Sequence, residues 1–201
     1  MTKVLVIYAS DYGHTRLAAD AVARGAESID GTAVRSRSAV DIGQEDVLDA
    51  DALVLGTPVH MGSVHWEMKR FIDESLSGLW HRDAIAGRVG GVFATGGGLG
   101  NAGGGCEFAM LSMMAVLAQL GLIIVPLPRS TSGFADAGHH WGPYARCGSQ
   151  SGNQTPLPNR CLPALTSHGA NIALAASAVA SCPTRSIFTP AQSDPLERTS
   201  S

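Results

Sequence analysis

The chain has 201 residues, 45% of them hydrophobic, and a formal net charge of −3. That length and apolar content suffice for one domain with a complete core, and the lack of a basic surplus argues against nucleic acid or an anionic membrane surface as a partner. The first residues pass from a short apolar run straight into a turn, unlike a secretory signal, so we expect a cytoplasmic protein.

Apolar runs of strand length alternate with helical patterns along most of the chain. Strands are expected at residues 4–8, 32–35, 52–55, 88–94 and 122–125. Helices are expected at residues 15–29, 64–75, 106–120 and 162–180. Strands that are apolar on both faces and alternate with helices predict a doubly wound α/β fold with a five-stranded parallel sheet. The natural strand order for such a sheet is 2-1-3-4-5, with ligands beyond the carboxyl ends of the strands.

The stretch 109–127 is nearly continuously apolar, so its length raises the question of a membrane helix. Gln119, Gly121 and Pro126 interrupt this stretch. The interruptions favour a buried helix followed by a buried strand, and no integral membrane segment is expected.

Two later regions lack a clear periodic pattern. Residues 127–161 are rich in Gly, Pro, Ser and His, and are long for a structureless connection within a domain. We expect a functional lid there, or a segment held by a neighbouring subunit. Residues 182–201 show little apolar periodicity and are expected to form a disordered tail, which leaves residues 1–181 as one domain.

The cysteines are widely spaced and contain no C-x-x-C pair, which favours reduced thiols over a disulfide framework. They are Cys106, Cys147, Cys161 and Cys182. A metal site built from Cys147 and Cys161 with His139 or His140 is conceivable, but this spacing fits no common ligand pattern, so no metal is expected.

A polar segment, residues 10–15, follows the first strand and leads into a helix. The unpaired N–H groups of a helix start can hold a phosphate, and a glycine lets the backbone turn around it. The alternative is an ordinary helix cap by Ser10 or Asp11. The candidate phosphate-binding residues are Ser10, Tyr12, Gly13, His14 and Thr15.

Residues 56–63 follow the third strand, and Pro58 with two glycines predicts a loop that projects from the sheet. Backbone amides near His60 and Met61 would face a flat ligand whose phosphate lies on the first segment. The alternative is a plain turn in which Ser63 caps the next helix.

Residues 94–107 follow the fourth strand and contain a literal G-x-G-x-x-G at Gly98, Gly100 and Gly103. A dinucleotide fingerprint would instead follow the first strand, with an acidic residue about twenty positions later, and neither condition is met. The glycines predict close approach of the backbone to a planar ligand, or else a flexible loop.

Taken together, S-D-Y-G-H-T (10–15), G-T-P-V-H-M-G-S (56–63) and G-G-V-F-A-T-G-G-G (90–98) resemble the flavodoxin-like family, in particular the WrbA-type NAD(P)H:quinone oxidoreductases. The resemblance covers roughly residues 2 to 128. It implies a flavodoxin-like sheet of order 2-1-3-4-5 and bound FMN. Where family members usually carry Arg-Phe, this chain has His60-Met61.

The resemblance also implies which residues contact FMN. Ser10, Gly13, His14 and Thr15 would hold the phosphate. The residues lining the isoalloxazine would be Pro58, Val59, His60, Met61 and Gly62. Those flanking its other side and the ribityl chain would be Thr95, Gly96, Gly97, Gly98 and Gly100. A homo-oligomer, dimer or tetramer, is implied as well, with a neighbouring subunit completing the site.

The expected activity is two-electron reduction of a quinone, or of another small aromatic acceptor, by NADH or NADPH through FMN. His60, His139 or His140 would donate a proton or hydrogen bond to the quinone oxygen, although each is also explained as a packing or surface histidine. One alternative is a flavodoxin-type one-electron carrier without NAD(P)H oxidase activity. The small net charge and the lack of an aromatic residue between Ala94 and Cys106 favour the enzyme. A further alternative is a structural or regulatory protein that has lost the flavin.

Overall fold

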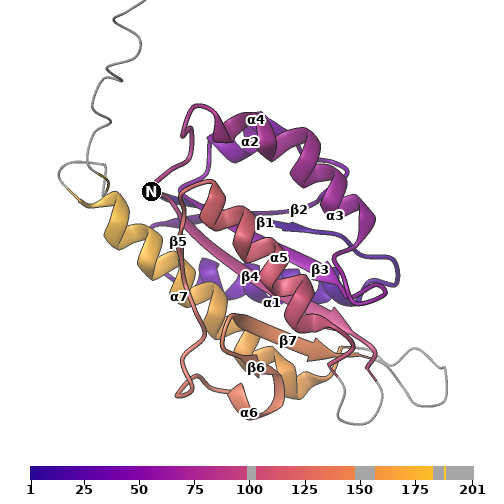
Figure 1. Ribbon diagram of the computed structural model, residues 1–201. Coiled ribbons are helices and arrows are strands. Elements are labelled where there is room, and N and C mark those ends of the chain that lie inside the picture. Colours follow the sequence, from indigo (N-terminus) through magenta and orange to yellow (C-terminus); the bar gives the residue numbers. More distant parts are fainter. Residues whose placement is uncertain (99–102, 148–156, 183–187, 189–201) are drawn as a thin grey trace, which may run out of the picture.

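The computed structural model describes residues 1–98, 103–147, 157–182 and 188, and it shows a mainly parallel sheet between two layers of helices (Figure 1). The sheet order is β2-β1-β3-β4-β7-β6, and β5 pairs with β4 off this path. The predicted order 2-1-3-4 is therefore confirmed, and only the β6–β7 pair is antiparallel among the described strands. The strands are β1 (Thr2–Tyr8), β2 (Thr32–Ser38), β3 (Ala52–Pro58), β4 (Val89–Gly96), β5 (Ile123–Ile124), β6 (Gly138–His139) and β7 (Gly142–Arg146).

The fifth position of the sheet is shared by two strands. β5 pairs with the beginning of β4, through Val89 and Gly90, whereas β7 pairs with its end, through residues 94–96. Part of the segment expected as a lid is thus a strand of the sheet. Its sequence, Gly-Pro-Tyr-Ala-Arg, starts with two residues that are rare in strands, so the pattern gave no strand signal.

Helices cover both faces of the sheet, and the two cores use alternate residues of β1. Val4 and Val6 pack with α1 and α7 on one face, and Leu5 and Ile7 pack with α2 to α5 on the other. The helices are α1 (His14–Glu27), α2 (Gln44–Leu48), α3 (Trp66–Phe71), α4 (Ser77–Trp80), α5 (Cys106–Gln119), α6 (Phe134–Ala137) and α7 (Leu162–Ala180). A π-helical turn (Ile72–Leu76) joins α3 to α4, and a 3-10 turn (Asn159–Cys161) precedes α7.

Close contact with α7 fixes the position of α1. A Cβ on Gly25 of α1 would lie 1.8 Å from the backbone oxygen of Thr166, and one on Gly169 of α7 would lie 1.9 Å from that of Val22. Glycine at both positions therefore lets the two backbones touch, and this packing sets where the N-terminus of α1 meets the sheet edge.

The apolar stretch 109–127 divides into α5 and β5, as predicted, and Gly121 with φ +76° turns the chain between them. Within the described part of the chain, no helix combines the length and apolarity needed to span a membrane. The tail expected from residue 182 onward lies almost entirely outside the described residues.

Candidate functional site

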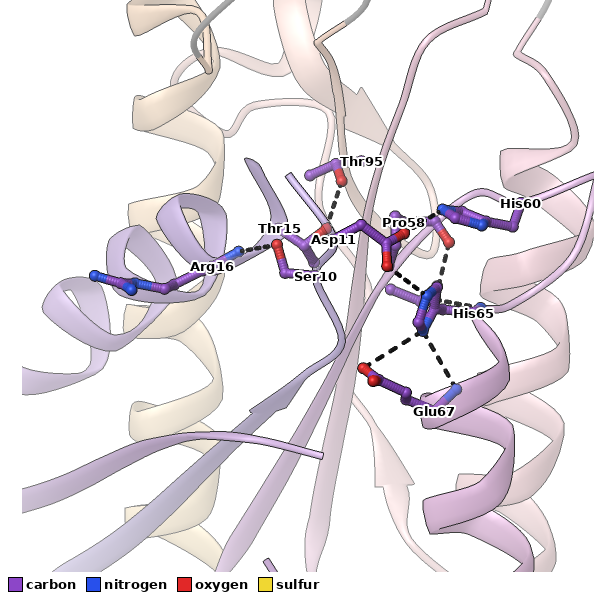
Figure 2. Close-up of polar contacts among 10 residues, drawn as sticks. Ser10, Asp11, Thr15, Arg16, Pro58, His60, His65, Glu67 and Thr95 are labelled. Atoms are coloured by element: carbon purple, nitrogen blue, oxygen red, sulfur yellow. Dashed lines mark hydrogen bonds and ion pairs between the residues drawn. The ribbon is translucent and has the colours of Figure 1, made fainter. Parts of the chain in front are cut away.

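The segments that follow β1, β3 and β4 meet at one edge of the sheet, because these parallel strands all end there (Figure 2). Oγ1 of Thr15, at the start of α1, lies 2.7 Å from Oγ1 of Thr95 at the end of β4. The N–H of Val59, just after β3, donates to the carbonyl of Thr95 at 2.8 Å. All three polar segments singled out in the sequence are therefore joined around Thr95.

The N-terminus of α1 has no side-chain cap. Its N-cap residue is Gly13, held at φ +86°, a left-handed conformation that glycine adopts without steric cost. Ser10 accepts only a long bond, 3.4 Å, from the N–H of Arg16, and Asp11 does not cap the helix. A Cβ on Gly13 would meet nothing within 4 Å. Within the described residues, Ser10 with its long bond is thus the only side-chain acceptor at this helix start, and its positive dipole end faces open space, which suits an anion.

Asp11 instead reaches the segment that follows β3. Its Oδ1 accepts a hydrogen bond from Nε2 of His65 at 3.0 Å, and its Oδ2 lies 2.9 Å from Nε2 of His60. The side chain of His65 is buried, whereas that of His60 is 43% exposed. The carboxylate therefore ties the first polar segment to the second, a role that the sequence reasoning did not foresee.

His65, rather than Ser63, caps the next helix. Nδ1 of His65 accepts from the N–H of Glu67 at 3.2 Å, so the ring proton sits on Nε2 and is donated to Asp11. The N–H of His65 donates to Oγ1 of the buried Thr57 at 2.9 Å. The ring is thus fixed from both sides. The alternative in which Ser63 caps α3 is therefore not realised, because histidine can also place an acceptor at a helix start.

The loop after β3 ends in a tight turn. His60 and Ser63 exchange two backbone hydrogen bonds of 3.0 and 2.9 Å, and Met61 and Gly62 between them have φ values of +48° and +77°. Two successive positive φ values are typical of a type I′ turn. The Met61 side chain is fully exposed at the tip. A Cβ on Gly105 would lie 2.4 Å from Cα of Gly62, so this turn rests directly on the start of α5.

The end of β4 brings small residues next to this turn. Thr95 is buried, and Gly96, Gly97 and Gly98 follow it along the same edge. A Cβ on Gly96 would lie 2.8 Å from the hydroxyl of Tyr144, which is buried and has no hydrogen-bond partner in the described part of the chain. Gly100, also singled out in the sequence, lies outside the described residues.

The remaining candidates lie in two places. Tyr12 and His14 are on the first polar segment, and Tyr12 is exposed. His139 and His140 lie on β6 and the turn to β7, where the rings of His139 and Trp141 pack at a tilt of 49° with their centroids 4.6 Å apart. Burial lowers the pKa of His139, and the negative charge of Glu107 partly opposes this. Among the described contacts, none joins His139 or His140 to His60, so the structure does not gather the three histidines into one cluster.

Comparison with known proteins identifies the group to which this architecture belongs. Residues 5–96 match the flavodoxin domain family. A flavodoxin of Aquifex aeolicus is 43% identical over 124 residues, which cover 62% of this chain and 64% of that protein. A protein of Rhizobium meliloti named NAD(P)H dehydrogenase (quinone) 3 is 38% identical over 152 residues, covering 66% of this chain and 70% of the relative.

Solved structures show the same fold over most of the chain. The flavodoxin WrbA-like protein from Agrobacterium tumefaciens matches with a TM-score of 0.68 at 26% identity, covering 89% of this chain and 99% of that one. An archaeal flavodoxin matches with a TM-score of 0.63 at 19% identity, over 88% of this chain. The chain thus belongs to the flavodoxin-like family.

Proposed function

We propose that the protein binds FMN with the flavin phosphate at the N-terminus of α1. The observation that carries this proposal is the uncapped helix start at Gly13, which opens into unfilled space. The chain's own donors fit a phosphate there: the N–H groups of residues 12–15 and the hydroxyls of Ser10 and Thr15. The flavodoxin domain match over residues 5–96 supports the same cofactor.

The two neighbouring segments suit the rest of a flat, polar cofactor. Residues 58–62 would present the backbone of the type I′ turn to one side of the isoalloxazine, with Val59 held in place by its bond to Thr95. Residues 95–98 would flank its other side, where the absence of bulky side chains allows close approach of the backbone. Bound FMN would supply hydride and electron transfer, and the protein would orient it and exclude water.

We further propose that the chain is an NAD(P)H:quinone oxidoreductase. The Rhizobium meliloti relative carries that name, and the exposed tip at Met61 leaves the loop open to a second planar molecule. The carboxylate of Asp11 contacts Nε2 of His60. Among the described contacts, Nδ1 of the same His60 ring has no hydrogen bond. Nδ1 is therefore the atom we expect to exchange a hydrogen bond or proton with a quinone oxygen. Donation of a proton or hydrogen bond to the quinone by His139 or His140 stays a prediction. The assembly of the chain into a dimer or tetramer stays a prediction as well.

The second candidate is a flavodoxin-type electron carrier, which the name of the Aquifex aeolicus relative favours. An anaerobic titration separates the two functions. Protein saturated with FMN is mixed with NADH or NADPH, and its visible absorption is followed. Rapid bleaching that benzoquinone reverses is the expected result. A flavin that only dithionite reduces, with no response to either nucleotide, would indicate the carrier and overturn the reductase.

A further inference from the structure

We propose that Asp11, His60 and His65 form a binding site for one divalent transition-metal ion of the Zn²⁺ type. In the described part of the chain they are the only group of at least three His, Cys, Asp or Glu residues whose ligand atoms converge, all within 4.8 Å of one another. Two imidazoles and one carboxylate suit zinc and its neighbours, whereas Mg²⁺ and Ca²⁺ favour oxygen ligands alone. The site borders the proposed flavin contacts, since Asp11 lies on the first polar segment and His60 on the loop after β3, but its ligand atoms are side-chain atoms that the proposed phosphate contacts do not use.

The ligand atoms lie within 4.8 Å of one another, so small side-chain shifts would bring them to the spacing that a small ion needs. Ligands of a tetrahedral zinc ion lie about 2.0–2.2 Å from the metal, and hence roughly 3.3 Å from one another. Nε2 of His60 and Nε2 of His65 lie 2.9 and 3.0 Å from the two oxygens of Asp11. The two rings meet edge to face, at an interplanar angle of 88° and a centroid distance of 4.8 Å. Both nitrogens thus point toward the same carboxylate, as Figure 2 shows.

The surrounding contacts hold these ligands in place. His65 is anchored by its N–H bond to Thr57, and His60 stands at the base of a type I′ turn. His65 is buried while His60 is half-exposed, so an ion would enter from the His60 side and keep a coordination position for water. Three protein ligands with an open position are typical of zinc sites that are not purely structural.

Glu67 offers the outer partner that such a histidine needs. A metal on Nε2 of His65 moves the ring proton to Nδ1, which then loses its bond from the Glu67 N–H. Oε2 of Glu67 lies 3.7 Å from Nδ1 and can accept the relocated proton after a small shift. A carboxylate behind a metal-bound imidazole orients the ring and strengthens it as a ligand. The carboxylates of Asp11 and Glu67 also balance the charge of the ion.

The test is titration of the untagged full-length protein, stripped with EDTA and desalted, with Zn²⁺ and then with Co²⁺ alone. Calorimetry is expected to show one tight site per chain. Bound Co²⁺ is expected to give visible bands of a tetrahedral or five-coordinate ion without thiolate charge transfer, since no cysteine belongs to the group. His60→Ala and Asp11→Asn should each weaken binding by at least about tenfold, and Glu67→Gln by less.

His81→Ala, a change at an exposed histidine outside the cluster, is the matched control and should bind as the parent does. His60 is half-exposed, so its replacement tests the site even if His65→Ala proves poorly folded. Three results would each overturn the proposal: no binding tighter than about 100 µM, unchanged affinity in His60→Ala, or a thiolate band with Co²⁺. None of them depends on whether FMN or NAD(P)H binds.

Discussion

Helices α1 and α3 follow the neighbouring strands β1 and β3, and the backbone groups at their N-termini are satisfied differently. α3 starts at His65, whose own side chain accepts the N–H of Glu67. α1 starts at Gly13 with no side-chain cap, although Ser10 and Asp11 stand just before it. A helix end left without partners is stable only where solvent or a ligand satisfies it. The chain thus caps α3 with its own side chain and leaves the start of α1 open, as the proposed phosphate site requires.

Asp11 makes this difference possible. Asp is among the best N-cap residues, yet here its carboxylate turns away from α1 and bridges His60 and His65. The bridge keeps a negative charge off the helix start and fixes the neighbouring loop. The same side chain thus leaves one helix start available and supports the residue that caps the other.

The largest expected effect on FMN affinity comes from a negatively charged side chain placed at the start of α1. Thr15 is buried and paired with Thr95, so Thr15→Glu breaks this pair and sets a carboxylate where the phosphate would lie. We expect FMN affinity to fall by at least about a hundredfold, measured by quenching of flavin fluorescence. Arg24→Glu, in the last turn of the same helix, is the control and should bind nearly as the parent does. Equal affinities in the two variants would refute the assignment.

A second prediction concerns α7, which holds α1 in place. His168 of α7 is fully buried, and this burial, only partly offset by the Val92 carbonyl, lowers its pKa to about 4. The unfolded chain therefore binds more protons than the folded one between about pH 6.5 and 4, and stability falls as pH drops through that window. The loss is of the order of 1–3 kcal/mol.

Urea unfolding across that pH range tests this expectation. His168→Gln should flatten the profile, because the group that titrates differently in the two states is gone. His81→Gln, at an exposed histidine, should keep the parent's acid sensitivity. A parent profile that is flat between pH 6.5 and 4 would contradict the assignment to His168.

The cap on α3 can be removed directly. His65→Ala takes away the acceptor for Glu67 and the bond to Asp11, so we expect a loss of about 1–3 kcal/mol in unfolding free energy. Ser63→Ala changes the residue named as the cap in the alternative interpretation of the sequence, and the loss of unfolding free energy should stay within about 0.5 kcal/mol. Urea denaturation measures both. The reverse ranking would mean that Ser63 caps the helix.

The smallest expected effect is a loss of stability when the left-handed backbone at the start of α1 must accommodate a side chain. Gly13→Ala forces a left-handed conformation on alanine at φ +86° and should cost about 1 kcal/mol. Gly43, the N-cap residue of α2, has φ −127° and equal space for a Cβ. Gly43→Ala should therefore cost less than Gly13→Ala in thermal unfolding. Equal costs would show that the positive φ of Gly13 does not constrain the helix start.

Much of the fold was predictable because its signals are local. The apolar runs predicted the central strands within a few residues, and the alanine-rich pattern predicted α7 at Leu162–Ala180. β7 was missed since its Gly-Pro start lacks strand propensity, and β4 supplies its stability through pairing. The short helix α2 was missed as well, since five residues are too few to show a helical period.

The site was predictable in outline only. The three polar segments were found because each follows an apolar strand in the sequence. The Asp11–His65 contact joins residues 54 positions apart, and no local pattern encodes it. The cap by His65 was missed for a related reason: histidine is not among the usual N-cap residues, and Ser63 is. The Asp11–His65 contact and the His65 cap both depend on the distance between loops, and that distance is set only when the strands pair in the sheet.

The most direct test of the open α1 terminus compares FMN with riboflavin, which lacks only the phosphate. Both are titrated into the same protein, and binding is followed by flavin fluorescence. If the phosphate is held by residues 10–15 at the helix start, FMN should bind at least about a hundredfold more tightly, as several charge-assisted hydrogen bonds would give. Equal affinities would contradict the account, since the uncapped start of α1 would then have no part in binding.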